Sequence, residues 1–106
     1  MDHFDYETEL QIVMAKSQLF QEDSEKIVKI VRGLRESGKT EFDPTIRGSI
    51  MIAKTMATLE TTPTESKELF TTICQDILSS ETSRIGSKTN QDRVRVIVKN
   101  LIEQYY

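Results

Sequence analysis

The segment Asp43–Lys54 holds the side chain with the most specific chemistry in this sequence, Arg47. Asp43 is a good N-cap residue, and Pro44 suits the first helical position because the N–H that proline lacks would have no intrahelical partner there. The sequence therefore predicts a helix that begins at Pro44, with Arg47 in its first turn. The helix dipole favours anions at that end, so an arginine there suggests an anionic partner. In an arbitrary helix, an arginine that is solvated or paired with a neighbouring carboxylate is more common.

Other kinds of reactive site find little support in the sequence. Gly38-Lys39-Thr40 spells the end of a Walker-type phosphate loop, but the residues before it form an amphipathic helix rather than a strand, and we interpret the match as chance. Cys74 is the only cysteine, and its apolar neighbours indicate a buried thiol. His3 is the only histidine and lies beside the amino terminus, which argues against a histidine-based catalytic centre. Taken alone, these residues do not indicate an enzyme.

The composition is typical of a small, well-solvated domain. The chain has 106 residues, of which 37% are hydrophobic and 29% charged, and its net charge is −3. A chain of this size fits one core, so we predict a single domain over residues 1–106. The net acidity argues against nucleic acid and against an anionic membrane surface as partners. The sequence shows no apolar run of membrane-spanning length and no signal segment at its start, so we expect a cytoplasmic protein.

Helical periodicity of the apolar residues predicts five helices. Their predicted ranges are about 6–17, 22–37, 44–59, 63–79 and 91–105. Asp5, Thr62 and Asn90 are the predicted N-caps of the first, fourth and fifth helices, and Gly38 is the predicted left-handed residue after the second. Gly33 lies inside the second helix, where a close crossing with another helix would explain a glycine.

The connections between these helices define the fold class. Residues 83–90 are polar and short-chained, which predicts a mobile loop before the C-terminal helix of residues 91–106. The segment 94–98 also alternates like a strand, but a single strand would have no partner in this chain. We therefore predict an all-α fold, a small antiparallel bundle of four to five helices.

Several stretches of the sequence are similar to one known family. They keep their order and spacing over residues 4–82, and they are Phe4–Leu10, Ala15–Ser17, Ile27–Arg32, Pro44–Ala53 and Phe70–Thr82. Together they resemble the C-terminal part of MoxR-like AAA+ ATPases, above all those that act in gas vesicle assembly. Beyond residue 83 the similarity is slight, and the last helix is predicted from its pattern alone.

The resemblance implies a lid domain of the AAA+ type. In such ATPases the nucleotide lies between a large P-loop domain and a small helical lid, and this chain resembles the lid alone. The resemblance implies that Arg47 is the "sensor 2" arginine, which reaches the terminal phosphates of ATP, with Thr45 and Ile46 beside the nucleotide. ATP and Mg²⁺ would be bound by the full-length parent, and the isolated chain would have no catalytic residue. Gly48 departs from the family pattern and would loosen the helix start.

The resemblance also implies partners for the chain. They would be a P-loop domain of the same parent protein and gas vesicle proteins, and the parent would form a ring-shaped oligomer in the cytoplasm. Its ATP hydrolysis would drive the assembly or remodelling of gas vesicle proteins.

Three alternatives remain open at this point. One is the lid of another MoxR-type ATPase, which activates a metalloenzyme. A second is a free-standing helical adaptor that binds a partner protein through a surface of Met51, Ile52 and Met56. A third, which the net acidity disfavours, is a helical module that binds nucleic acid through Arg93, Arg95 and Lys99.

Overall fold

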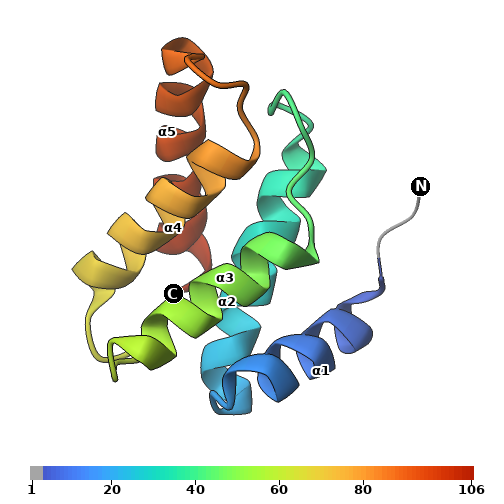
Figure 1. Cartoon of the computed structure of the whole chain (residues 1–106), viewed down its shortest axis with the longest axis vertical. Coiled ribbons are helices and arrows are strands. Elements are labelled where there is room, and N and C mark those ends of the chain that lie inside the picture. Colours follow the sequence, from blue (N-terminus) through green and yellow to red (C-terminus); the bar gives the residue numbers. More distant parts are fainter. Residues whose placement is uncertain (1–3) are drawn as a thin grey trace.

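The computed structural model describes residues 4–106 as five helices, with no strand in that part of the chain (Figure 1). The helices are α1 (Tyr6–Ser17), α2 (Gln21–Ser37), α3 (Ile46–Thr58), α4 (Lys67–Glu81) and α5 (Lys88–Tyr105). The predicted all-α helical bundle is confirmed. His3, the sole histidine, lies outside the described residues.

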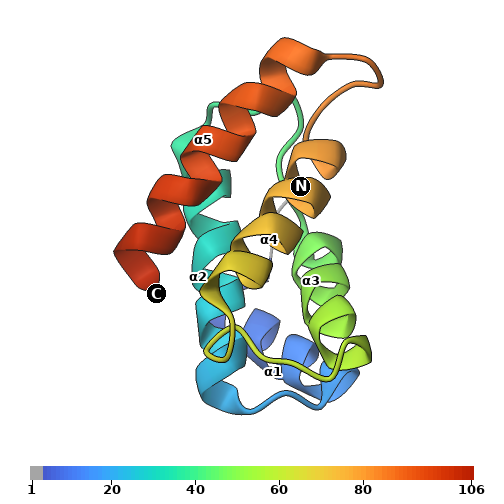
Figure 2. The ribbon, with the colours of Figure 1, turned by 90° about the vertical axis from the view of Figure 1, so that its left-hand side faces the viewer.

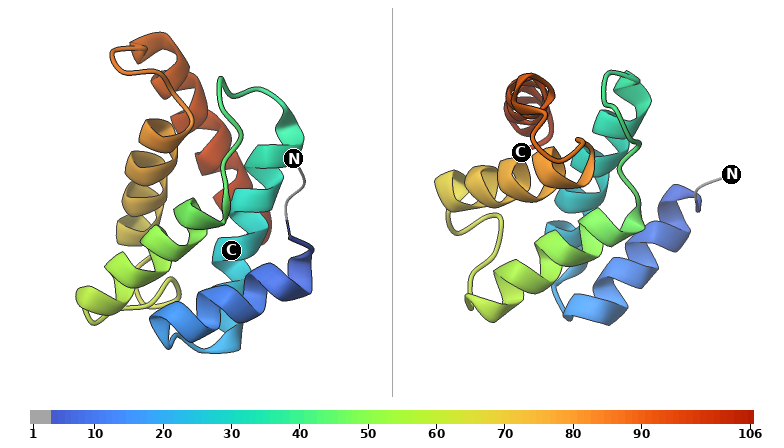
Figure 3. Two further views of the ribbon diagram at one scale, coloured as in Figure 1. Left: turned by 45° about the vertical axis from the view of Figure 1, so that its right-hand side comes forward. Right: turned by 45° about the horizontal axis from the view of Figure 1, so that its top comes forward.

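The helices pack so that α3 lies between α1 and α4. α4 and α5 form an antiparallel hairpin, and α5 also packs against α2 (Figure 2). α1 crosses the far end of the bundle, where it contacts both α2 and α3 (Figure 3). A backbone hydrogen bond of 3.0 Å from the Phe42 N–H to the Thr82 carbonyl joins the α2–α3 connection to the end of α4. As a result, the start of α3 lies beside the end of α4.

Each helix contributes one apolar face to a single core. Burial of such faces is the main favourable term in folding, at roughly 25 cal/mol for each Å² of apolar surface. Val94, Val98 and Ile102 follow one another at four-residue spacing and are fully buried, so α5 is an integral part of the bundle. The other buried apolar residues are Leu10, Val13, Ile27, Val28, Ile30, Val31, Leu34, Ile52, Ala53, Met56, Phe70, Ile73, Cys74 and Leu78.

Several local features agree with the sequence. α1 begins after Asp5, whose Oδ1 accepts a hydrogen bond of 2.8 Å from the Thr8 N–H. α2 ends at Gly38, which has the left-handed φ of 64° that glycine adopts most readily. Gly33 lies at a close helix crossing, because a Cβ there would be only 2.7 Å from Cδ2 of Leu101 in α5. The explanation predicted for this glycine is confirmed.

The starts of α3 and α4 differ from the prediction. α3 begins at Ile46 with Thr45 as its N-cap, so Asp43 is not the cap and Pro44 lies before the helix. The structure has α4 beginning at Lys67 with Ser66 as its cap. Thr62, the predicted cap, instead accepts a hydrogen bond of 3.2 Å from the Glu65 N–H in a separate turn. Each connection contains more than one residue that can cap a helix, and the structure uses Thr45 and Ser66.

The start of α5 also differs. It begins at Lys88, so residues 88–90 belong to the helix and not to the predicted loop. Asn90 is not the N-cap: its side chain is buried and its amide donates to Ser83 Oγ at 2.6 Å and to the Thr82 carbonyl at 3.4 Å. These bonds tie the first turn of α5 back to the end of α4. Mobility of the remaining loop residues stays a prediction.

Candidate functional site

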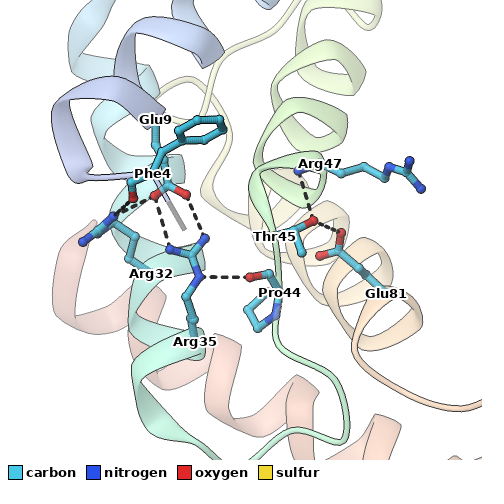
Figure 4. Close-up of polar contacts among 8 residues, drawn as sticks. All are labelled: Phe4, Glu9, Arg32, Arg35, Pro44, Thr45, Arg47 and Glu81. Atoms are coloured by element: carbon cyan, nitrogen blue, oxygen red, sulfur yellow. Dashed lines mark hydrogen bonds and ion pairs between the residues drawn. The ribbon is translucent and has the colours of Figure 1, made fainter. Parts of the chain in front are cut away.

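The first turn of α3 presents Arg47 to solvent. Thr45 Oγ1 accepts a hydrogen bond of 3.2 Å from the Arg47 N–H, and the Thr45 carbonyl accepts one of 3.0 Å from the Gly48 N–H. Arg47 therefore stands in the first turn, as predicted, although the helix begins two residues later than expected. Its side chain is exposed and extends away from the helix (Figure 4).

Arg47 lines a surface cavity of about 960 Å³ between the start of α3 and the last turns of α4. All three residues predicted for the nucleotide site, Thr45, Ile46 and Arg47, contribute to its lining. Cavities that bind small molecules commonly have volumes of this order and combine apolar walls with a few polar groups. The remaining lining residues are Phe42, Asp43, Met51, Asp76, Ile77, Ser80 and Glu81.

The guanidinium of Arg47 forms no ion pair within 4 Å among the described residues. Three acidic residues line the cavity: Asp76 pairs with Arg95 of α5 at 2.8 Å, Glu81 binds Thr45, and Asp43 forms no ion pair in the described chain. A cation at a helix start without a carboxylate partner is unfavourable for the isolated helix. An external anion would supply the missing partner.

Glu81, at the end of α4, contacts this helix start directly. Its Oε2 accepts a hydrogen bond of 3.1 Å from the Thr45 hydroxyl, and its Oε1 is buried without a hydrogen-bond partner. Burial raises the pKa of Glu81 above its ordinary value, while the hydrogen bonds of Thr45 and the charges of Arg47 and Arg35 oppose that rise. The carboxylate lies against Gly48, where a Cβ would be 2.5 Å from Oε1. Gly48 therefore serves close packing between α3 and α4.

A buried ion cluster positions the segment before α3. Glu9 of α1, which is 1% exposed, accepts hydrogen bonds from Arg32 at 2.8 Å and from Arg35 at 2.9 Å, both on α2. The Nε of Arg35 also donates to the Pro44 carbonyl at 3.0 Å (Figure 4). Charge-assisted bonds of this kind are stronger than neutral ones. Through them, α1 and α2 hold the residue that directly precedes the N-cap of α3.

Sequence reasoning missed both Glu9 and Glu81. Glu9, Val13 and Ser17 follow one another at four-residue spacing and share the buried face of α1. That spacing was a usable signal for burial. Nothing local to Glu81 indicates that it would meet a residue 36 positions earlier in the chain.

The Walker-like letters do not form a phosphate loop here. Residues 33–40 read Gly-Leu-Arg-Glu-Ser-Gly-Lys-Thr, the full eight-residue pattern. A phosphate loop connects a strand to the start of a helix, whereas Gly33–Ser37 lies inside α2 and Gly38 ends it. The backbone N–H groups of Gly33–Ser37 are thus occupied within a helix, and that of Gly38 donates to the Arg35 carbonyl.

The apolar surface predicted for an adaptor is not present as predicted. Met51 is 47% exposed, but Ile52 and Met56 are fully buried in the core. The helix turns its Ile52–Met56 face inward because burial of these apolar side chains in the core is favourable. The adaptor hypothesis therefore loses two of the three residues on which it depended.

Other parts of the described chain add no second site. Cys74 is buried, as predicted, and burial raises the pKa of its thiol, which makes it a poor nucleophile. Within residues 4–106 no group of three potential metal-ligating side chains occurs. None of the helices described combines the length and apolar character needed to cross a membrane.

Comparison with known proteins agrees with the resemblance to gas vesicle ATPases. The chain is 31% identical to the gas vesicle ATPase GvpN of Haloferax mediterranei over 103 residues, which cover 95% of this chain and 28% of the relative. It is 27% identical to GvpN of Ancylobacter aquaticus, over 99% of this chain and 30% of the relative. The chain thus spans less than a third of the length of these curated relatives.

Two further comparisons gave no match. No protein-family model matches the sequence, and no solved structure matches the fold. The similarity to GvpN also extends past residue 83, where the sequence pattern alone showed little.

Proposed function

We propose that this chain, similar over nearly its whole length to gas vesicle ATPases, is the helical lid domain of an AAA+ ATPase, with Arg47 as the arginine that senses nucleotide phosphates. The observation that carries the proposal is an exposed arginine in the first turn of α3, beside a cavity and without an ion pair to any residue of 4–106. The similarity to GvpN supplies the ATPase context.

The cavity lining combines a cation with apolar surface, and a nucleotide can use both. A guanidinium forms strong, directional hydrogen bonds with phosphate oxygens and keeps its charge at every physiological pH. Phe42, Ile46 and Met51 supply apolar surface near it. Thr45 has its hydroxyl engaged with Glu81, so its role is to cap the helix that carries Arg47.

ATP hydrolysis would need groups that this chain does not carry. Mg²⁺ would neutralise charge on the phosphates and hold them in line for attack, within a P-loop domain of the parent protein. The lid would contribute Arg47, whose bond to the terminal phosphate couples the nucleotide state to the position of the lid. By itself the chain would bind ATP weakly and would not hydrolyse it.

The partners and location follow from the same proposal. The lid would act with a P-loop domain of its own parent, in a cytoplasmic ring oligomer whose substrates are gas vesicle proteins. The similarity to GvpN supports the gas vesicle context.

The test is substitution of Arg47 in an ATPase that joins this segment to its P-loop domain. Arg47→Ala is expected to lower ATP hydrolysis at least about tenfold, because loss of a charge-assisted hydrogen bond costs about 1.5–3 kcal/mol. Lys54→Ala, which removes an exposed cation from the same helix, is the matched control and should leave turnover unchanged. Equal turnover in the Arg47 variant and the wild type would refute the sensing role.

A further inference from the structure

Glu81 occupies the position at which an anion would meet the start of α3. One of its oxygens holds the N-cap hydroxyl of Thr45, and the other is buried against Gly48 without a partner. The amino-terminal end of a helix is a favourable site for anions, since unpaired N–H groups and the helix dipole both attract negative charge. Figure 4 shows the Glu81 carboxylate beside Thr45, with the Arg47 side chain leaving the same turn.

We propose that Glu81 is an internal anion that competes with nucleotide phosphates for the start of α3, next to Arg47. This inference depends on the proposed function and adds to it a residue that sets the affinity of the site. In the nucleotide-free chain the carboxylate neutralises the helix start. Phosphates bound at Arg47 add negative charge to the same cavity, repel the carboxylate and release its bond to Thr45.

The charged groups around Glu81 support this competition. Arg47 of α3 and Arg35 of α2 attract the carboxylate, while Asp43 and Asp76 line the same cavity with negative charge. Asp76 is already paired with Arg95 of α5. Burial makes the charged form of Glu81 unfavourable, as its raised pKa indicates. The carboxylate is therefore held by one hydrogen bond, while burial opposes its charge.

Loss of the Thr45–Glu81 hydrogen bond would also affect how α3 and α4 pack against each other. The Thr45–Glu81 hydrogen bond connects the cap of α3 to the last residue of α4, and Gly48 allows the two helices to approach closely at this point. Displacement of Glu81 by phosphates would remove this connection. Nucleotide binding would thereby loosen α4 against α3, which is a local rearrangement that other domains could detect.

The experiment measures binding of inorganic triphosphate to the purified 106-residue chain by NMR, from the amide signals of Arg47 and Gly48. Glu81→Gln keeps an oxygen that can accept from Thr45 but removes the charge, and it should tighten binding about fivefold, the effect of one charge at a helix end. Asp43→Asn removes a negative charge from the same cavity without touching the cap. Because solvent screens the exposed Asp43, its gain in affinity should be smaller, less than about twofold. Arg47→Ala should abolish the gain when combined with Glu81→Gln.

The outcomes separate the two proposals. If Glu81→Gln binds no more tightly than the wild type while Arg47→Ala weakens binding, Glu81 is not a competitor and the phosphate-sensing role stands. An equal gain in Glu81→Gln and Asp43→Asn would also overturn the role of Glu81, because it would show a general charge effect. If Glu81→Gln tightens binding in the presence and absence of Arg47 alike, the competition stands and the sensing role of Arg47 fails.

A second variant tests position instead of charge. Gly48→Ala leaves every charge in place but puts a methyl group 2.5 Å from Glu81 Oε1 and 3.2 Å from Leu78 Cδ2, so the carboxylate must move. It should tighten triphosphate binding in the same direction as Glu81→Gln. Weaker or unchanged binding in a variant that remains folded by circular dichroism would contradict the proposal.

Discussion

Glu9 and Arg47 are charged residues with opposite surroundings. Glu9 is buried and receives hydrogen bonds from two arginines, so its charge is compensated inside the fold. Arg47 is exposed and has no carboxylate within ion-pair distance in the described chain. A buried charge that loses its partner costs far more than a surface charge does. The first residue therefore affects the stability of the fold, and the second is available for a ligand.

Substitution of Glu9 tests this view at the residue scale. Glu9→Gln should lower the free energy of unfolding by about 3 kcal/mol, because it leaves the largely buried Arg35 without its countercharge. Glu7→Gln, on the exposed face of the same turn, should change it by less than about 0.5 kcal/mol. Urea denaturation monitored by circular dichroism measures both, and equal midpoints for the two variants would show that the cluster contributes little.

At the scale of elements, the helix interiors and the helix starts behave differently. The interiors follow the apolar periodicity, and all five predicted helices are present. The starts of α3, α4 and α5 shift by two to four residues from the predicted positions, because each connection offers more than one capping side chain. For α3, the bond from Arg35 to the Pro44 carbonyl holds the chain extended up to Thr45. Contacts with other helices thus select the cap.

The two candidate caps of α4 can be compared directly. Ser66 Oγ accepts a hydrogen bond of 3.3 Å from the Leu69 N–H, so Ser66→Ala should destabilise the chain by about 1 kcal/mol. Thr62 accepts a hydrogen bond only within the turn that precedes α4. Thr62→Ala should therefore destabilise the chain by less than half as much as Ser66→Ala. Thermal unfolding of both variants provides the measurement. A larger loss for Thr62→Ala would mean that the helix begins where the local pattern predicted it.

At the scale of the whole molecule, Tyr106 connects segments that are distant in the sequence. Its hydroxyl donates to the Pro63 carbonyl at 2.7 Å in the α3–α4 connection, and its own carbonyl accepts from Lys26 Nζ at 3.0 Å on α2. The ring lies 6.3 Å from Phe70 and within cation–π range of Lys26 and Lys67. These contacts join α2, α4 and α5 at one end of the bundle.

Tyr106→Phe isolates the contribution of the hydroxyl. The variant should lose about 1 kcal/mol of stability, because the bond to Pro63 is lost while the ring contacts remain. Tyr105→Phe is the control, since Tyr105 is 37% exposed and should tolerate the change. Chemical denaturation with a two-state fit gives both values, and no difference between the variants would show that the Tyr106 hydroxyl contributes little to holding the end of α5.

The sequence by itself determined the features that depend on neighbouring residues. The five helices follow from apolar spacing, and the end of α2 follows from Gly38. Arg47 lies in a first turn as predicted, although Thr45 caps that helix and not the predicted Asp43. The Walker-like sequence of residues 33–40 shows that such a pattern does not determine local structure by itself, because in this chain it lies at the end of a helix.

Only the tertiary structure decided where the charges meet. Glu9 and Arg35 are 26 residues apart, and Thr45 and Glu81 are 36 apart, yet these pairs build the start of α3 and the edge of its cavity. Local spacing holds no information about such pairs, since the packing of helices brings them together. The packing depends on the summed burial of many apolar side chains, whereas the site depends on a few polar atoms that this packing places within about 3 Å of one another.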